Sequence, residues 1–571
     1  MKKNKANANK GFGHKLISEF KMISKDPILL ITIIAVIFSL FLFIILPLYH
    51  VLKQSLIDLD GNFSISGYIT AFTSSSNFAS IVNTLVLATI VGVIATIIGF
   101  VFAYAAAYIK MRGKKLFNLI AILPLISPPF AISISIIFMF GSRGLITHDL
   151  LGLNDFNIYG LTGLVLVQSL SFFPLAYLLL SGVLETIDPS MEEASQNLGG
   201  SRWNTFAKVT FPLAKPAIVN AFLLVFIKSI ADFGNPIAIG GGYNTLAVQI
   251  YQQAIGNYDM AGAAALAVIL LDISLIMFIV QKYYFENKSY VTVTGKSAKE
   301  RLMIGEKHIR LPISMFCITA SLIIIALYAL IPLGSVVKLW GINYSLTFDH
   351  YIYVFSVGKK AILDTTIFAA IAAPITGIVG MIVAYLIVRK RFLGRTFVDF
   401  TSMLGIAIPG TVIGIGYILA FNSPPVVLTG TALILIIAFI ARSVPVGIKS
   451  AVTTLQQIDP SIEEAAQDLG ANSFKVFTTI TLPMIKTAFL GGLIYSFIKS
   501  MTALSAVIFL ISAKYNLMTI VILDQVEVGK FGTASAFSTV LIAIVYLAIF
   551  IMYRIVGLFG VSKKDIKLTK G

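Results

Sequence analysis

The stretch IDPSMEEASQNLGGSRWNTFAKVTFP, residues 187–212, recurs as IDPSIEEAAQDLGANSFKVFTTITLP at residues 458–483. The two copies align without a gap at a constant offset of 271 residues (458 − 187). Each copy is a polar segment between long apolar runs, and we name them the first and second islands. A segment that recurs in this way indicates that the chain consists of two related halves.

The apolar surroundings of the islands decide the fold class. Of the 571 residues, 57% are hydrophobic and only 12% are charged, and the mean hydropathy is +0.91. Soluble domains carry about 25% charged residues, and uninterrupted apolar runs of 18 or more residues indicate transmembrane helices. These runs do not alternate apolar with polar residues, as the strands of a membrane barrel do. We therefore expect an all-α, polytopic membrane protein.

The apolar runs predict about twelve spans, six in each half. An even number per half gives the halves the same orientation, so they form a parallel repeat. The expected spans of the first half are residues 28–48, 81–109, 116–140, 161–184, 217–239 and 261–280. Those of the second half are residues 311–333, 361–388, 397–420, 429–448, 488–510 and 533–555. Helix breaks inside the membrane are expected at Pro124, Pro128, Pro129 and Pro409.

Basic residues predict the orientation in the membrane. They gather at both ends of the chain, after the second and eighth spans, and between the halves, so all fall on one side. The positive-inside rule makes that side cytoplasmic, and both islands face it. The net charge of +17 is therefore explained by the basic cytoplasmic segments of a membrane protein and does not indicate binding to nucleic acid. The expected parts are a cytoplasmic tail 1–26, transmembrane domains 27–281 and 311–556, a cytoplasmic linker 282–310 and a cytoplasmic tail 557–571.

Each island predicts a helical hairpin. In the first, Asp188 caps a helix that begins at Pro189 and ends at Gly199. A second short helix then opens at Ser201 and ends at Pro212. The second island repeats this pattern with Asp459, Pro460, Gly470, Asn472 and Pro483.

The second short helix of each hairpin carries large apolar residues three apart, on one face. These residues are Trp203, Phe206 and Val209 in the first island and Phe474, Phe477 and Ile480 in the second. One interpretation is that they pack beneath the helix bundle. Because two matched copies face the same side, we favour a two-fold receptor for a two-fold partner.

The islands also resemble a known signature. Glu192-Glu193-Ala194 with Gly199, and Glu463-Glu464-Ala465 with Gly470, resemble the EAA motif of permease subunits of bacterial ABC importers. The resemblance implies the plasma (inner) membrane, a separate dimer of ATP-hydrolysing subunits and an extracytoplasmic solute-binding protein. It also implies that each hairpin is a coupling helix. The expected coupling residues are Glu192, Glu193, Ala194, Gly199, Trp203, Phe206, Glu463, Glu464, Ala465, Gly470, Phe474 and Phe477.

Two further segments indicate a substrate. The stretch SIADFGNP at residues 229–236, followed by three glycines at 240–242, and the stretch ALSAVIFL at 503–510 are similar to permeases for ferric iron. Fused permeases for aminoalkylphosphonates carry similar segments, and a polyamine or thiamine remains an alternative solute. A secondary transporter driven by an ion gradient is a remote alternative, because it leaves the islands unexplained.

The sequence predicts no enzymatic activity. Gly295-Lys296-Ser297 resembles the end of a P-loop, but Tyr290 stands where that motif requires a glycine. No metal-binding or Ser/His/Asp pattern is apparent among the five histidines and the carboxylates. We therefore expect no catalytic residue, no metal and no cofactor in this chain, with ATP used by a partner subunit.

Charged residues inside spans are candidates for a translocation path. Lys228 and Lys499 are related by the repeat, Asp232 follows Lys228 by one helical turn, and Ser500 follows Lys499. Two other interpretations stay open: the lysines extend to the membrane surface, or Lys228 pairs with Asp232 within the fifth span. We slightly favour these two structural interpretations over a role in the translocation path, because lysine repels iron unless the metal travels with anions.

Overall fold

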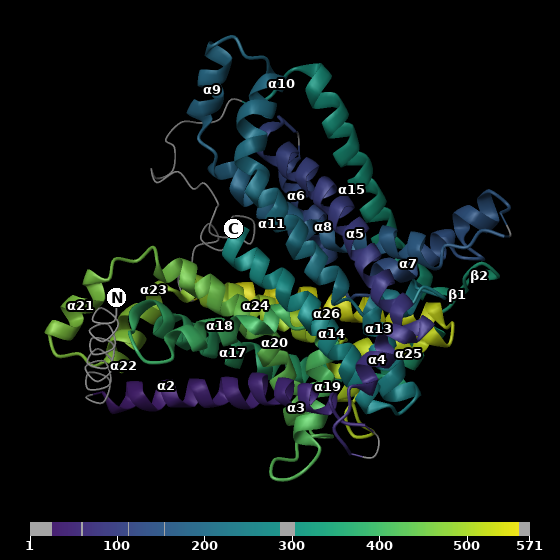
Figure 1. Ribbon diagram of the computed structural model, residues 1–571. Helices are drawn as coiled ribbons and strands as arrows, with labels where there is room; N and C mark the ends of the chain where they lie inside the picture. Colours follow the sequence, from purple (N-terminus) through teal and green to yellow (C-terminus); the bar gives the residue numbers. More distant parts are fainter. Residues whose placement is uncertain (1–25, 59–60, 112, 154, 286–302, 559–571) are drawn as a thin grey trace.

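The computed structural model describes residues 26–58, 61–111, 113–153, 155–285 and 303–558 (Figure 1). Most of the N-terminal tail, linker residues 286–302 with Gly295-Lys296-Ser297, and residues 559–571 lie outside the described residues. Ten described helices are long and apolar enough to cross a membrane, and two bent helix pairs bring the number to twelve. The prediction of an all-α protein with about twelve spans is confirmed.

The elements follow one another as two series, in which η marks a π-helical or 3₁₀ turn. The first half contains α2 (Pro27–Leu40), η1 (Phe41–Ile45), α3 (Leu46–Gln54), α4 (Ser66–Thr73), α5 (Ser75–Tyr108), α6 (Lys114–Ile126), α7 (Ala131–Phe140), η2 (Leu145–Leu150), α8 (Leu161–Thr186), α9 (Pro189–Asn197), α10 (Arg202–Thr205), η3 (Phe206–Thr210), α11 (Phe211–Ile230), α12 (Gly234–Ile239), α13 (Leu246–Tyr251), η4 (Gln252–Gly256), α14 (Met260–Val280) and η5 (Gln281–Phe285).

The second half repeats this order with a small addition. It contains α15 (Lys307–Ser335), β1 (Val337–Leu339), β2 (Asn343–Leu346), α16 (Asp349–Ser356), α17 (Lys359–Arg389), α18 (Arg395–Ala407), α19 (Gly410–Phe421), α20 (Ala432–Leu455), α21 (Ser461–Asp468), α22 (Ser473–Val476), η7 (Phe477–Thr481), α23 (Leu482–Met484), α24 (Lys486–Met501), η8 (Val507–Phe509), α25 (Met518–Glu527) and α26 (Phe531–Leu558). The addition is the antiparallel pair β1–β2, in which Val337 is opposite Leu346.

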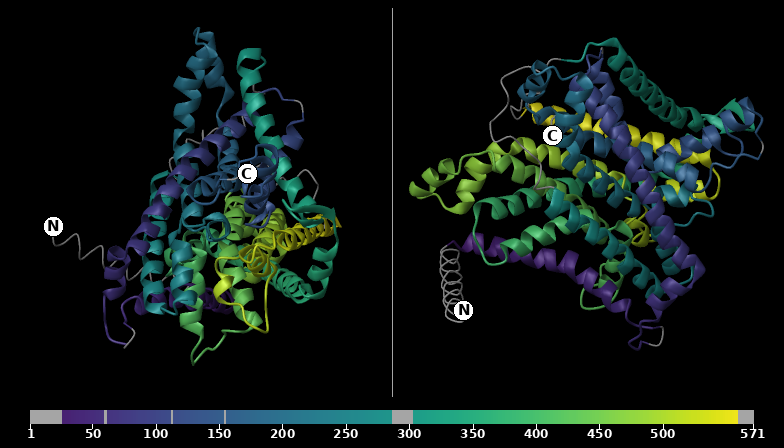
Figure 2. Two further views of the ribbon diagram at one scale, coloured as in Figure 1. Left: turned by 90° about the vertical axis from the view of Figure 1, so that its right-hand side faces the viewer. Right: turned by 45° about the horizontal axis from the view of Figure 1, so that its top comes forward.

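The first span of each half packs against the other half. On α2, Ile33 and Leu40 are buried in a cluster with Met381 of α17. On α15, Cys317 and Ile324 are buried in a cluster with residues of α5 and α8. Figures 1 and 2 show α2 beside the helices of the second half and α15 beside those of the first. This exchange interlocks the halves, because neither buries its apolar faces without a helix from the other.

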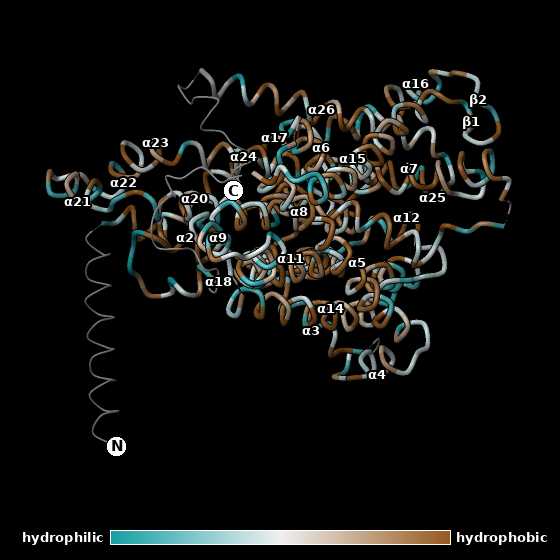
Figure 3. Tube along the Cα trace, turned by 90° about the horizontal axis from the view of Figure 1, so that it is seen from above, coloured by the Kyte–Doolittle hydropathy of each residue, from teal (hydrophilic) through white to brown (hydrophobic). Residues whose placement is uncertain are grey.

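The two hairpins lie at one end of the molecule. Figure 1 shows α9 and α10 apart from α21 and α22 at that end, with α7, α13 and α25 gathered at the other. In Figure 3 the labels α21, α22 and α9 likewise lie to the left of α7 and α25. Hydrophilic residues mark α9 and α21. Both hairpins therefore lie on the same side of the molecule, as the parallel repeat predicts.

The third and ninth spans are broken, as the prolines predict. In the third, α6 ends before Pro128 and Pro129, whereas Pro124 lies inside α6 and does not break it. In the ninth, α18 and α19 meet at Pro409 with a bend of 113°. Proline lacks the N–H that would continue the helical ladder, and such breaks are stable in a membrane only where protein or a cavity surrounds them.

The fifth span differs from its predicted bounds of 217–239. A single helical rod runs from Arg202 to Ile230, so Pro212 does not end the second hairpin helix. The π-helical turn η3 precedes this proline, and within it Phe211 donates its N–H to the carbonyl of Phe206. Because hydrogen bonds in a π-helical turn join residues five apart instead of four, the turn accommodates Pro212, which has no N–H to donate. The rod stops before Asp232, and the eleventh span likewise stops at Met501 rather than at residue 510.

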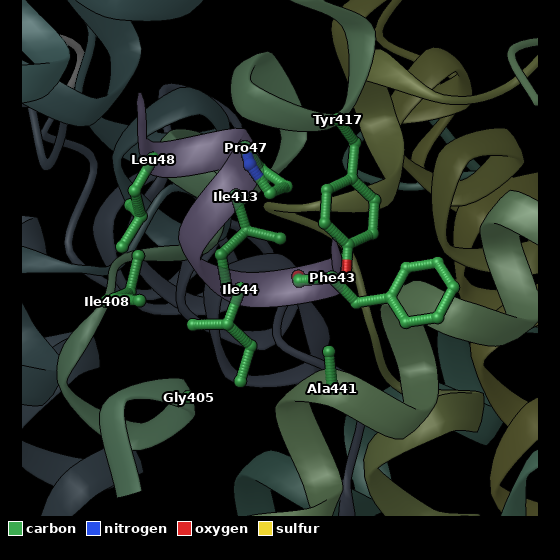
Figure 4. Close-up of a pocket in the computed structure, with 9 residues that line it drawn as sticks. All are labelled: Phe43, Ile44, Pro47, Leu48, Gly405, Ile408, Ile413, Tyr417 and Ala441. Carbon is green, nitrogen blue, oxygen red and sulfur yellow. Dashed lines mark hydrogen bonds between the residues drawn. The ribbon is translucent and has the colours of Figure 1, made fainter. Parts of the chain in front are cut away.

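A small apolar pocket shows how η1 and α3 hold the broken ninth span (Figure 4). The Tyr417 hydroxyl of α19 donates a hydrogen bond to the Phe43 carbonyl oxygen, 3.0 Å away, inside the π-helical turn η1. Pro47 lies one turn further along and contributes to the same pocket. Pro47, four residues after Phe43, has no N–H to donate to this carbonyl, so the fully buried Tyr417 supplies a donor instead.

We expect Tyr417→Phe to lower the free energy of unfolding by about 1 kcal/mol, because the buried carbonyl of Phe43 loses its donor. Thermal unfolding of the purified protein in detergent measures the change. Tyr258→Phe is the matched control, since Tyr258 is 84% exposed. Equal melting temperatures for the two variants would show that the hydroxyl contributes nothing.

Candidate functional site

Each island folds as the hairpin that its sequence predicts. The Asp188 side chain accepts a hydrogen bond from the Ser190 N–H at 2.9 Å, and Asp459 accepts one from the Ser461 N–H at 3.0 Å. The helix α21 begins at Ser461, one residue after the predicted Pro460. Gly199 and Gly470 both have φ of +85°, a left-handed conformation that glycine adopts without strain and that ends each first helix.

The first glutamate of each EAA sequence is buried beneath its hairpin. Glu192 Oε1 accepts hydrogen bonds from the hydroxyls of Tyr108 and Thr210, both at 2.8 Å. Glu463 Oε1 accepts one from the Thr481 hydroxyl at 3.0 Å and faces Arg389 Nε at 3.2 Å. These contacts join each hairpin to the long helix before it, α5 or α17. The glutamates therefore fix the orientation of the hairpins and do not form their outer surface.

Other residues of the motif lie further out. Glu193 is half-buried, whereas Ala194, Glu464 and Ala465 are exposed. Their position on the outer side of α9 and α21 leaves them accessible to another molecule.

The expected aromatic face divides into an inner and an outer part. Trp203 is 70% exposed and Phe474 is 56% exposed. Phe206 is half-buried against the Tyr104 ring, with 5.5 Å between ring centroids, and Phe477 packs against Tyr385 in the same way at 5.2 Å. The helical wheel could not separate these two roles, because the neighbouring long helix decides which ring is covered.

Sequence reasoning missed the most exposed apolar residues of the hairpins. Leu198 and Leu469, each directly before the glycine that ends the first helix, are both 89% exposed. Their equivalence at the offset of 271 was the available signal. We define the hairpin tips as the exposed large apolar residues in the ranges 187–205 and 458–476: Met191, Leu198 and Trp203 in the first, and Ile462, Leu469 and Phe474 in the second.

Each hairpin is also held by the start of the opposite half's first span. Arg202 Nε of the first hairpin lies 3.0 Å from Glu306 Oε1, at the start of α15. In the second hairpin, the Ser473 N–H donates to Asp26 Oδ2 at 3.2 Å, at the start of α2. These reciprocal contacts extend the exchange of first spans to the hairpins.

Both carboxyl groups of these contacts have lowered pKa values. For Asp26, burial raises the pKa, but hydrogen bonds from Ser473 and from the Leu29 N–H together outweigh it. For Glu306, its own backbone N–H and the Arg202 guanidinium lower the pKa. A lowered folded-state pKa stabilises the structure at neutral pH, and that contribution is lost as the pH falls through it.

A cavity lies between the halves, with an empty volume of about 1600 Å³ that includes its opening. Lys228 of α11 and Asp232 face it from the first half, and Arg442 of α20 and Lys499 of α24 face it from the second. Ser500 is buried beside this wall and does not line the cavity. Arg442 was missed in the sequence, although an arginine inside the tenth apolar run was a visible signal.

The ion pair considered for Lys228 and Asp232 does not form. The Asp232 carboxylate instead accepts hydrogen bonds from Gln168 Nε2 and Asn235 Nδ2, both at 2.8 Å. Among the described residues, no carboxylate oxygen lies within 4.0 Å of the charged groups of Lys228, Arg442 or Lys499. No group of three or more potential metal ligands occurs within the described part either.

The buried pair of Arg389 and Glu463 yields a test of hairpin anchoring. We expect Arg389→Met or Glu463→Gln alone to lower the free energy of unfolding by roughly 3–5 kcal/mol, since each leaves a buried group without its partner. The double variant should lose less than the sum of the two. Thermal unfolding of all four proteins measures this coupling, and strictly additive losses would contradict it.

Comparison with known proteins agrees with this architecture. Residues 95–287 and 376–560 each match the family described as Binding-protein-dependent transport system inner membrane component. The same family matches twice, once in each half, so the predicted duplication is confirmed.

Three relatives illustrate the range of similarity. The ferric transport system permease protein FbpB of Actinobacillus pleuropneumoniae is 36% identical, covering 96% of this chain and 81% of that protein. A provisionally named ferric transport system permease, FbpB 1 of Haemophilus influenzae, is 37% identical, covering 87% of this chain and 80% of its own length. A provisionally named 2-aminoethylphosphonate transport system permease, PhnU of Salmonella typhimurium, is 28% identical over 41% of this chain and 84% of its own.

The family matches cover more than half of the chain, and the first of these relatives aligns along nearly all of it. The helices, the two hairpins and the cavity between the halves are consistent with a multi-pass transport subunit of an inner membrane. The chain therefore belongs to the family of inner membrane components of binding-protein-dependent transport systems, as two copies fused in one polypeptide.

Proposed function

We propose that this chain is the permease subunit of an ABC importer that carries ferric iron inward. The observation that carries the proposal is the 36% identity to a ferric transport permease over 96% of the chain. The chain supplies both halves of the path, and the cavity between them is the proposed substrate passage. Solute arrives from an extracytoplasmic binding protein at the end that carries α7, α13 and α25 (Figure 1).

ATP-hydrolysing subunits dock on the two hairpin tips in this proposal. Leucines that are 89% exposed at the outermost turn are costly in water unless a partner covers them. Two equivalent tips at the same end suit a dimeric partner. The positive-inside distribution supports placing this end, and both chain termini, in the cytoplasm.

The fifth span provides a route from docking to the cavity. One helical rod joins Trp203 at a hairpin tip to Lys228 at the cavity, over about 40 Å at 1.5 Å per residue. Movement of the docked subunit therefore displaces the cavity wall directly. In the second half the path is less direct, because α23 and α24 separate at Ile485.

One alternative substrate has support from a specific observation. The cavity presents more cationic than anionic side chains, which favours an anionic solute such as an aminoalkylphosphonate. The same charge disfavours polyamines and thiamine, which are cations. A secondary transporter driven by an ion gradient leaves the exposed hairpin tips without a role.

Uptake by whole cells separates the substrates. A strain that lacks its own ferric and phosphonate permeases should regain uptake of labelled ferric iron when this chain is expressed with its ATPase and binding protein. Recovery of 2-aminoethylphosphonate uptake without iron uptake would assign the alternative.

We expect the double variant Leu198→Asp and Leu469→Asp to bind the ATPase subunits at least about tenfold more weakly, because truncating or charging a central apolar anchor typically costs about 2 kcal/mol or more. Co-purification from mild detergent measures the loss. Leu346→Asp is the control, since Leu346 is 79% exposed on β2, far from the hairpins. Unchanged recovery of the ATPase with the double variant would move the docking site away from the tips.

A further inference from the structure

The charge of the central cavity is strongly one-sided. Its ionisable lining comprises the cationic groups of Lys228, Arg442, Lys449 and Lys499, the Asp232 carboxylate and the Tyr495 phenol. Lys449 lies at the exposed rim, whereas the other three cations lie deeper. Four cations against one carboxylate leave an excess of positive charge between the halves.

The three deeper cations repel one another. Lys499 and Arg442 are both close enough to Lys228 for their charges to act on it. The one carboxylate of the lining accepts hydrogen bonds from Gln168 and Asn235 rather than from a cation. Like charges gathered in a low-dielectric site are unfavourable unless something neutralises them, so a negative partner from outside the chain would stabilise the cluster.

A buried donor without an acceptor points to the same conclusion. Arg442 Nη1 is buried and has no hydrogen-bond partner among the described residues. It lies close to Gly410, as does the Ser505 hydroxyl. A side chain at Gly410 would collide with both the Arg442 guanidinium and this hydroxyl. Gly410 is the first residue of the twelve-residue helix α19, whose amino end favours anions. A guanidinium, a hydroxyl and a helix amino end thus converge at the cavity wall.

We propose that the cavity is an oxyanion site, and that ferric iron passes through it as a complex whose charge is neutralised by phosphate or carboxylate ligands. This inference rests on the proposed function and names the form of its substrate. A bare trivalent cation would meet repulsion from three cations, whereas oxyanions on the iron would contact them directly. Lys228 and Lys499, related by the repeat, would hold the complex from the two halves.

Binding of anions to the purified full-length chain tests the site without transport. Inorganic phosphate and citrate are the probes, and they distinguish phosphate from carboxylate ligands. The melting temperature of the chain in detergent should rise as the concentration of either probe is raised, because a ligand that binds only the folded state stabilises that state. Calorimetric titration gives the dissociation constant.

Three variants locate the binding. Lys499→Met and Arg442→Met should each weaken binding by about tenfold or more, since each removes a charge-assisted contact. Both should also melt at or above the temperature of the unchanged chain without anions, because they relieve repulsion. Lys215→Met, on the exposed face of the same helix as Lys228, should bind as the unchanged chain does.

Two results would overturn the oxyanion site. One is the absence of any phosphate or citrate effect on the unchanged chain, and the other is equal binding by Lys499→Met, Arg442→Met and Lys215→Met. Ferric uptake gives an independent reading: if the chain supports it while anion binding fails, the inference falls and the proposed function stands. Anion binding without ferric uptake would retain the site and reject the iron substrate.

Discussion

A lipid-facing backbone amide has no water to bond, so every irregular segment of this chain must be enclosed by protein or open to a cavity. The breaks obey that constraint. The third, fifth, ninth and eleventh spans all depart from a continuous helix, and segments beside each departure line the central cavity, among them Pro129, Asp232, Ile408 and Thr502. The break of the ninth span is also enclosed by an exchanged first span, because Tyr417 donates a hydrogen bond to the Phe43 carbonyl oxygen of η1. The exchange and the cavity are therefore consequences of one physical requirement.

The two halves are more alike in the geometry of their hairpins than in the chemistry of the contacts that hold them. Tyr108 and Arg389 are the last residues of the long helices α5 and α17, and both contact the buried glutamate of a hairpin. A phenol gives a neutral hydrogen bond, whereas a guanidinium gives a buried ion pair that also bonds two backbone carbonyls. The two hairpins are thus positioned alike but held by interactions of different strength, so an equal push from a symmetric partner would meet unequal resistance.

The cavity narrows the explanations for the intramembrane lysines. A lysine inside a span has three common explanations: pairing, extension to the surface, or function. Pairing with Asp232 is excluded by the amide groups that hold that carboxylate, and extension is excluded for Lys228 and Lys499 because both face the space between the halves. Helical periodicity could place Asp232 one turn from Lys228, but it could not reveal that α11 ends at Ile230 and directs the two side chains differently.

The sequence by itself determined the number and approximate positions of the spans, the parallel duplication and the hairpins, because these depend on local composition, caps and a repeat at fixed offset. Gly199 and Gly470 end the first helices as their left-handed conformation requires, and Pro409 breaks the ninth span where predicted. Only the tertiary structure decided what each side chain faces. It buried Glu192 and Glu463, exposed Leu198 and Leu469, carried the helix through Pro212, and brought Arg442 to Lys228 and Lys499. Most of those outcomes arise from contacts between separate elements, such as Glu192 with Tyr108 at 84 residues' separation, which periodicity within a single helix does not encode.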